Sequence, residues 1–219
     1  MRDLLRVKFK GYYLAYMMQG LILITTLYSI YLGLYSVTFT GLVALGLTTL
    51  PYLVHRKVHI VVPWEITFLI AFALFLHIAG YSFEWYLDFY PYYDKLAHLV
   101  SSITIALLGF LSVLVLMKIS RCLQFEPWQI FLFIVIFTVA LGAIWEIWEF
   151  TLDTLFPTYL IKPLQQGLAD TMIDMIFNLA GGLLVAVLGT LYLKRKGADA
   201  ITDSLVEPGY DITLPGMKR

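Results

Sequence analysis

The chain has 219 residues, of which 60% are hydrophobic and only 14% are charged. A soluble globular domain is about one quarter charged and less than half apolar, so this composition excludes a soluble fold and requires lipid as the solvent. The formal net charge is zero, which argues against a nucleic-acid partner. The single cysteine, Cys122, excludes an internal disulfide. The composition therefore predicts an integral protein of the lipid bilayer.

The first 54 residues contain the first two predicted membrane spans. The N-terminal segment MRDLLRVKFKGYY is basic, and the apolar stretch behind it is too long for a signal peptide, so we interpret it as a retained anchor. From Gly11 to Val54 there is no charged residue and no histidine. As one helix this run would be about 66 Å long, roughly twice the thickness of a hydrocarbon core. We therefore expect a reversal near residues 35–40 and spans at about 12–34 and 38–54, with Pro51 near the second end.

Four further apolar segments follow, at about residues 64–86, 95–117, 128–150 and 168–193. Tryptophans at their ends, Trp64, Trp85 and Trp128, occupy positions typical of membrane interfaces. The predicted fold class is thus all-α: a polytopic domain of six transmembrane helices over residues 1–193. A polar, flexible cytoplasmic tail is predicted over residues 194–219.

The distribution of Lys and Arg predicts the orientation of the bundle. With six spans, thirteen of the fifteen basic residues fall on one side, and only Lys95 and Lys162 fall on the other. Cytoplasmic loops carry the excess of Lys and Arg, so we expect both termini in the cytoplasm. The cytoplasmic set comprises Arg2, Arg6, Lys8, Lys10, Arg56, Lys57, Lys118, Arg121, Lys194, Arg195, Lys196, Lys218 and Arg219.

Polar side chains gather in the outer halves of the later spans, at spacings that place each set on one helix face. The fourth span begins with DKLAHLVSS, the fifth ends with IWEIWEF, and the sixth begins with DTMIDMIFN. In the third span, His77 and Glu84 are seven residues apart and lie toward the same end. The other members are Asp94, His98, Ser102, Glu146, Glu149, Asp170, Asp174 and Asn178.

These acids are too costly to face lipid. A carboxylate in the middle of the membrane costs about 2.5 to 3.5 kcal/mol, and Lys95 is the only base nearby. Bound protons or a bound metal ion must therefore balance the charge. We expect the side chains to meet in one pocket near the extracytoplasmic surface. A distance above about 10 Å from His98 to both Asp174 and Glu146 would contradict this, since it is too long for a shared ion or solvent bridge.

Several of these residues also have a purely structural interpretation. The glutamate pair of the fifth span fits a helix end that reaches headgroup water, and Asp170 fits the N-cap of the sixth span. His77 fits a hydrogen-bonded core histidine, and Asn178 and Ser102 fit hydrogen bonds between helices.

A weak internal repeat points to the same end of the bundle. Aligning DKLAHLVSS, from residue 94, with DTMIDMIFN, from residue 170, places His98 opposite Asp174. Each segment follows an outer loop. The pattern indicates that spans three and four and spans five and six are parallel repeats.

The segments YYDKLAHL, WEIWEF and QQGLADTMIDM resemble the YjdF-like family of predicted inner-membrane proteins of bacteria and archaea. More distantly, the chain resembles VanZ-like proteins, and the resemblance covers about residues 85–190. One departure is LVSS after His98, where phenylalanine and a small residue are expected. The resemblance implies no established activity. It implies that the family's polar positions fall on Asp94, His98, Glu146, Glu149, Asp170 and Asp174.

Three functions remain open at this point. The first is divalent-metal-dependent hydrolysis of a lipid or polyprenyl phosphate, since carboxylates with an imidazole suit Mg²⁺, Mn²⁺, Zn²⁺ or iron. The second is proton- or cation-coupled transport, although the cytoplasmic halves of the spans are almost free of acids. The third is a non-catalytic subunit or scaffold of a membrane complex, whose protein partners the sequence does not indicate. For the first, the expected ligands are Asp94, His98, Glu146, Glu149, Asp170 and Asp174, with His98 and Glu149 catalytic and Asn178, Ser102, His77 and Glu84 supporting.

Overall fold

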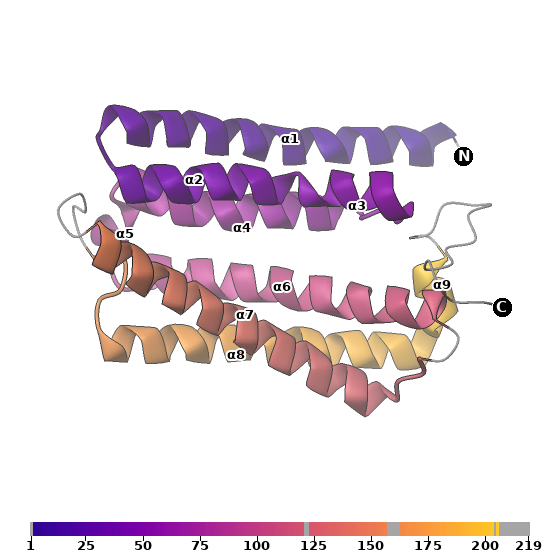
Figure 1. Ribbon diagram of the computed structural model, residues 1–219. Coiled ribbons are helices and arrows are strands. Elements are labelled where there is room, and N and C mark those ends of the chain that lie inside the picture. The colour runs from indigo at the N-terminus through magenta and orange to yellow at the C-terminus, as the bar shows by residue number, and fades with distance from the viewer. Residues whose placement is uncertain (1, 121–122, 157–162, 204, 206–219) are drawn as a thin grey trace.

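The computed structural model describes residues 2–120, 123–156, 163–203 and 205, and Figure 1 shows a bundle of long helices lying side by side. Within these ranges the helices are α1 (Arg2–Tyr31), α2 (Tyr35–Thr48), α3 (Leu50–Val58), α4 (Trp64–Ser82), α5 (Trp85–Asp88), α6 (Tyr92–Ile119), α7 (Pro127–Leu155), α8 (Leu168–Lys196) and α9 (Ala198–Thr202). Four of the basic residues used to predict orientation, and residues 206–219 of the predicted tail, lie outside the described ranges. The four are Arg121, Lys162, Lys218 and Arg219.

Among the described residues, six segments are long and apolar enough to cross a membrane, which confirms the predicted fold class. Five of them lie in the single helices α1, α4, α6, α7 and α8, and the sixth combines α2 and α3 over Tyr35–Lys57. The interruption at Thr49 comes just before Pro51, which is placed in the first turn of α3, where its missing N–H removes no helical hydrogen bond.

The first reversal of the chain occurs slightly earlier than predicted, between Tyr31 and Tyr35. Gly33 adopts a φ of +71°, and its N–H donates to the carbonyl of Ile30 while the next N–H, from Leu34, donates to Ser29. These two bonds form the turn that glycine commonly allows at helix ends. The glycine, rather than the hydroxyl residues that follow it, therefore determines where α1 ends.

Other helix ends also differ from the predicted spans. The third span ends at Ser82 rather than near residue 86, because Glu84 adopts a left-handed φ of 60° that starts the short helix α5. The fifth span continues to Leu155, five residues beyond the predicted end. The glutamate pair of α7 therefore lies more than one turn inside the helix and is buried, not frayed into headgroup water.

The first part of the predicted flexible tail is folded. After α8, the short helix α9 packs against α6, where Lys118 contacts Asp199 and Asp203 at 2.8 and 3.0 Å. The carbonyl of Leu205 then accepts a hydrogen bond of 2.8 Å from the N–H of Val61. This segment closes one end of the bundle.

The bundle consists of two three-helix halves. Residues such as Ile22 of α1, Ala44 of α2 and Ile78 of α4 form one buried cluster. Phe110 of α6 and Ile134 of α7 belong to a second cluster, which α8 completes. The halves meet mainly where α4 packs on α6, whereas α7 crosses α6 and α8 obliquely (Figure 1).

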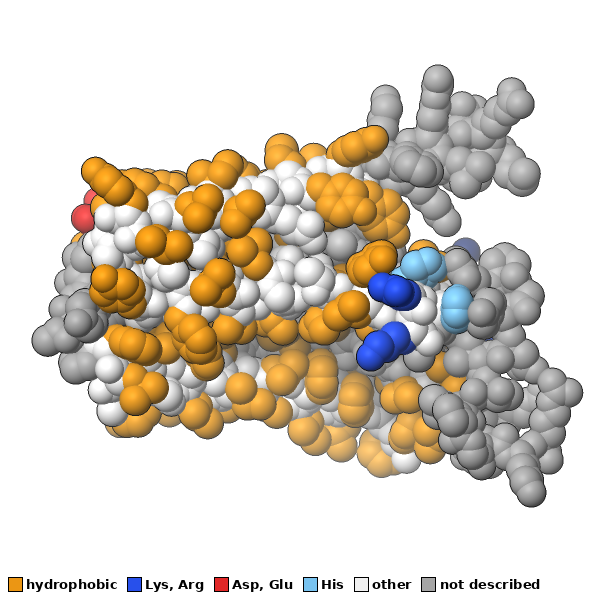
Figure 2. All heavy atoms as spheres, turned by 45° about the horizontal axis from the view of Figure 1, so that its top comes forward, with side chains coloured by type: hydrophobic (Ala, Val, Ile, Leu, Met, Phe, Trp, Pro, Cys, Tyr) orange, Lys and Arg blue, Asp and Glu red, His pale blue; other side chains and the backbone are white. Residues whose placement is uncertain are grey.

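The outer surface has the polarity expected in lipid. Large apolar side chains are exposed on α1, α2, α3, α6, α7 and α8, and Figure 2 shows them along the length of the bundle, with Lys, Arg and His side chains together at one end. We call this the basic end; the exposed Arg56 and Lys57 lie there, at the end of α3. The opposite end, which carries α5 and the start of α8, is the site end.

Candidate metal centre

A lysine and three aspartates form an ionic network at the site end. Lys95, in the first turns of α6, places its ammonium 2.8 Å from Asp94, 2.6 Å from Asp170 and 2.7 Å from Asp174. The lysine side chain is only 11% exposed. One cation therefore holds the start of α8 against the start of α6.

His98 lies one turn deeper on the same face of α6 and is surrounded by carboxylates. Its Nε2 atom is 3.6 Å from Asp94 Oδ1, 3.8 Å from Glu146 Oε1 and 3.8 Å from Asp174 Oδ1. The distances from His98 to Glu146 and to Asp174, both 3.8 Å, are thus far below the limit of about 10 Å for a shared ion or solvent bridge. Polar side chains from three separate helices, α6, α7 and α8, therefore meet at one point.

Two of the atoms that face this point are unpaired. Among the described residues, His98 Nε2 and Glu146 Oε1 are buried without a hydrogen-bond partner, as is the amide nitrogen of Asn178. Buried polar atoms are nearly always hydrogen-bonded, and an exception calls for an unseen partner such as an ion or water. His98 Nε2 and Glu146 Oε1 therefore keep unused capacity to bind a hydrogen-bond partner or a metal ion.

The interatomic distances suit a metal ion. Ligand atoms that share one ion at about 2.0–2.2 Å lie at most about 4.4 Å apart, and the oxygens around His98 Nε2 are within 3.8 Å of it. Two overlapping sets have all their ligand atoms within 4.8 Å of one another. One contains Asp94, His98 and Asp174, and the other contains His98, Glu146 and Glu149.

The second glutamate of α7 is held by its own helix. Trp145 lies one helical turn before Glu149, and its Nε1 donates to Glu149 Oε1 at 3.0 Å. This bond fixes the carboxylate beside Glu146 and the imidazole of His98. It is the kind of supporting hydrogen bond that orients metal ligands.

His77 is a hydrogen-bonded core residue rather than an available ligand. Its Nδ1 lies 3.0 Å from the hydroxyl of Tyr86, and its Nε2 lies 3.1 Å from Ser101 Oγ. Burial and the charge of Asp94 raise the pKa of Tyr86 well above the usual value of a phenol, so Tyr86 remains a hydrogen-bond donor. The His77 ring is perpendicular to that of His98, with 5.4 Å between their centroids, and supports it by packing.

The remaining predicted residues differ in their placement. Asn178 is buried, with its side chain against Gly142 of α7. Ser102 Oγ donates to the carbonyl of Leu99 in its own helix and, at 3.4 Å, to the carbonyl of Phe177 in α8, which is a hydrogen bond between helices of the kind predicted for it. Asp170 is not an N-cap, since Gly167 holds that position; its carboxylate accepts from the N–H of Gln166 and from Lys95.

Glu84 does not reach the centre. The prediction assumed that the third span continued as a helix through Glu84, which would place Glu84 and His77 on the same helix face. In the structure, α4 ends at Ser82 and Glu84 is exposed. Its left-handed backbone turns the side chain out of the helical register. Glu84 therefore lies outside the set of buried polar residues, and the supporting role predicted for it stays a prediction.

Helix packing closes the floor of the centre toward the middle of the bundle. A methyl group on Gly142 would overlap the side chain of Asn178, and one on Gly181 would overlap Ser102 Oγ. These glycines allow α7 and α6 to approach α8 more closely than any other residue would. The helices are thus closely packed on the side of the centre that faces the basic end.

The structure adds residues that the sequence pattern did not place in the site. Lys95 was noted only as a nearby base, although its position beside Asp94 in DKLAH is the signal for its role. Trp145 shows a similar signal, since it precedes Glu149 by one helical turn. Asp153 accepts the backbone N–H groups of Leu164 and Gln165, each at 2.8 Å, and so anchors the segment that leads into α8.

Comparisons with known proteins concern the whole bundle. Residues 13–195 match the family described as predicted membrane protein (DUF2238). An uncharacterized protein of Thermotoga maritima is 32% identical over 150 residues, which cover 67% of this chain and 72% of the relative. No solved structure matches the chain. The family match includes every residue of the centre.

Proposed function

The chain belongs to the DUF2238 family of predicted membrane proteins, and we propose that it binds a divalent metal ion between α6, α7 and α8. The proposed ligands are His98, Glu146, Asp174 and Asp94, with Glu149 adjacent. We further propose that the bound ion serves hydrolytic chemistry on a lipid or polyprenyl phosphate.

The observation that carries the proposal is the pair of unpaired, buried atoms His98 Nε2 and Glu146 Oε1, which lie 3.8 Å apart. The distance is too long for a hydrogen bond and suits two ligands of one ion. A scaffold role for the cluster would predict that these atoms bond to each other or to their neighbours. Charge balance supports the same conclusion, because the five clustered carboxylates face one lysine.

Each residue of the centre has a distinct proposed role. A divalent ion lowers the pKa of a bound water and polarises a phosphoryl oxygen. Asp94 and Asp174 have oxygens that contact both Lys95 and the His98 side of the centre, so Lys95 orients two ligands at once. Glu149, held by Trp145, is the candidate general base.

The proposed location is the cell membrane, with the centre on the extracytoplasmic side and both termini in the cytoplasm. The exposed Arg56, Lys57 and Lys194 lie at the basic end. At the site end, the charge of Lys95 is neutralised by the aspartates that it contacts. This asymmetry supports a cytoplasmic basic end. The resemblance to YjdF-like and VanZ-like proteins fits this location.

Coupled transport is less well supported by the packing. A path for ions or protons from the centre toward the basic end would need polar groups along it that can bind them. The hydroxyls of Thr104, Thr138 and Thr190 instead each donate to a carbonyl of their own helix. The close glycine contacts at this depth leave the helices no space to part without a large rearrangement.

Metal analysis of purified protein tests the metal proposal. Wild-type protein, dialysed against a mixture of divalent ions and analysed by mass spectrometry, should contain about one tightly bound ion per chain. Glu146→Gln should lose it, whereas Glu84→Gln, a matched change of an exposed glutamate at the same end, should keep it. Wild-type protein without bound metal after this treatment would refute the proposal.

A phosphate-release assay tests the reaction. The metal-loaded protein, reconstituted with a polyprenyl phosphate, should release inorganic phosphate, and Glu149→Gln should abolish release while metal is retained. Release that is equally fast in metal-free protein would exclude the proposed chemistry.

A further inference from the structure

The ammonium group of Lys95 occupies a position that has the ligands of a small cation site. Lys95 Nζ donates to Asp94 Oδ2 at 2.8 Å, to Asp170 Oδ1 at 2.6 Å and to Asp174 Oδ1 at 2.7 Å. An ammonium has three donors and no acceptor, so these three contacts leave Lys95 no donor for a substrate. We call this place the lysine position.

The size of the lysine position suits a divalent ion as well as an ammonium. Its three carboxylate oxygens lie 2.6–2.8 Å from Lys95 Nζ. Ca²⁺ binds carboxylate oxygens at about 2.3–2.6 Å and completes its shell with water, so each oxygen would move by only about 0.2–0.3 Å. Mg²⁺, at about 2.0–2.1 Å, would require a movement of about 0.6 Å. The position therefore favours an ion of the size of Ca²⁺.

Two of the three carboxylates also face a second position, beside His98. Asp94 Oδ2 contacts the ammonium while Asp94 Oδ1 lies 3.6 Å from His98 Nε2, and Asp174 Oδ1 lies 3.8 Å from the same nitrogen. His98 Nε2 is buried and unpaired among the described residues. Shared carboxylates thus place two cation positions side by side, as in two-metal sites, whose ions lie about 3.5–4 Å apart.

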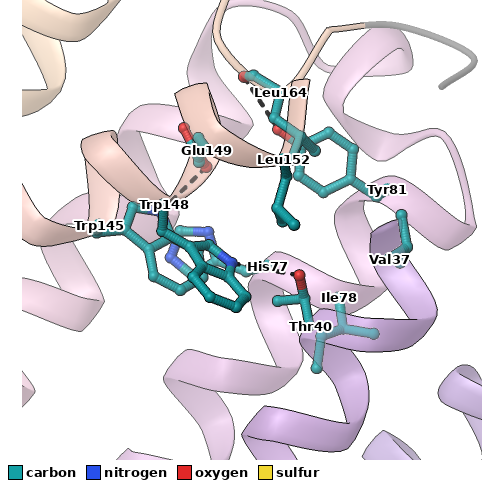
Figure 3. Close-up of a pocket in the computed structure, with 10 residues that line it drawn as sticks. All are labelled: Val37, Thr40, His77, Ile78, Tyr81, Trp145, Trp148, Glu149, Leu152 and Leu164. Atoms are coloured by element: carbon teal, nitrogen blue, oxygen red, sulfur yellow. Dashed lines mark hydrogen bonds between the residues drawn. The ribbon is translucent and has the colours of Figure 1, made fainter. Parts of the chain in front are cut away.

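The position beside His98 is not filled in the same way. Glu146 Oε1 lies 3.8 Å from His98 Nε2 and has no hydrogen-bond partner in the described part of the chain. Glu149 accepts a hydrogen bond from the neutral indole of Trp145 (Figure 3). One of the two positions therefore holds a cation that belongs to the chain, and the other keeps its ligand atoms available.

We propose that the centre has two cation positions and that the ammonium of Lys95 permanently fills one of them, which limits the protein to one exchangeable metal ion. Without the ammonium, the lysine position is a site for a divalent cation of the size of Ca²⁺, with Asp94, Asp170 and Asp174 as ligands. The pairing of the ammonium with a metal ion rests on the proposed function. The lysine position has a ligand of its own, because Asp170 belongs to neither ligand set around His98.

Counting bound ions in two lysine variants tests this inference. Lys95→Ala removes the ammonium and leaves space for an ion and its water ligands, whereas Lys95→Met removes the same charge but fills the space with an apolar side chain. In equilibrium dialysis of the full chain in detergent against Ca²⁺, Lys95→Ala should bind one ion per chain more than wild type. Lys95→Met should show no such gain. Asp170→Asn, added to Lys95→Ala, should remove the additional ion.

Thermal unfolding gives a second measurement, because loss of the ammonium also destabilises the site end. An ion that binds only the folded chain stabilises it in proportion to the logarithm of its concentration. Lys95→Ala, purified in Ca²⁺ throughout, should therefore unfold at a temperature that rises with Ca²⁺ by more than in wild type or Lys95→Met. A Lys95→Ala chain that is as unstable with Ca²⁺ as without it, or that folds in neither condition, would overturn the inference.

The ion counts distinguish this inference from the metal proposal. If wild type binds no ion but Lys95→Ala binds one that Asp170→Asn abolishes, the lysine position is supported and the proposed metal function fails. If wild type and Lys95→Ala each bind one ion, the metal proposal stands and the second position is refuted. An additional ion that Asp170→Asn does not affect would also refute it.

Discussion

Replacing Lys95 with methionine should be the most destabilising charge removal in this protein. The substitution keeps the length and apolar stem of the side chain but removes the ammonium that contacts Asp94, Asp170 and Asp174 at 2.6–2.8 Å. Three carboxylates would then face one another without a cation. The start of α8 would lose its ionic connection to α6.

The expected loss is about 3 kcal/mol. Breaking a buried ion pair by removing one partner costs about 3–5 kcal/mol, and the Asp174 side chain is only 2% exposed. Asp94 and Asp170 are nearer to water, at 12% and 13%, so hydration or protonation recovers part of the cost. The lower end of the range is therefore appropriate.

Reversible unfolding in mixed detergent micelles measures this loss. Lys118→Met is the matched control, because Lys118 also contacts two aspartates, at 2.8 and 3.0 Å, but its side chain is 36% exposed. Exposed pairs contribute about 0.2–1 kcal/mol. In the Lys95→Met background, Asp170→Asn should restore stability by removing one of the repelling charges. Equal, small effects of the two lysine substitutions would refute the conclusion that Lys95 organises the site end.

Three further outcomes follow from the geometry. Gly181→Ala should destabilise the protein by about 1–3 kcal/mol, because its methyl group would overlap Ser102 Oγ; adding Ser102→Ala should recover part of the loss in the same unfolding assay. Glu84→Gly should leave stability unchanged or raise it by up to about 1 kcal/mol, because glycine adopts a positive φ without strain, and a clear loss would show that the Glu84 side chain has a role. Trp145→Phe should slow phosphate release by about 10–100-fold while metal is retained, because it removes the donor that orients Glu149, and an unchanged rate would exclude Glu149 as the general base.

The number of spans and the location of the polar cluster could be predicted from the sequence because both depend on local patterns. Long apolar runs define helices whatever their neighbours are. Spacings of three and four residues place His98 and Asp174 on faces that lipid would penalise, so these faces had to meet inside the bundle. The structure places the two side chains 3.8 Å apart.

The parts that could not be predicted depend on backbone conformation and on contacts between distant residues. The end of α4 at Ser82 results from a left-handed residue, Glu84, that no pattern marks, since glutamate rarely adopts this conformation. The contact between Thr40 of α2 and Trp148 of α7 depends on how far apart these two helices lie, and hydropathy carries no information on that separation. The folding of α9 and its packing on α6 could not be predicted either, because a polar sequence is compatible with either a flexible tail or a short helix.

Pulsed electron paramagnetic resonance of Mn²⁺-loaded protein tests the central claim most directly, because it detects nitrogen atoms bound to the ion. The account predicts coupling to one imidazole nitrogen, altered by ¹⁵N-labelled histidine, lost in His98→Gln and retained in His77→Gln, since both nitrogens of His77 are hydrogen-bonded elsewhere. Manganese that binds without nitrogen coupling, or coupling that persists in His98→Gln, would contradict it.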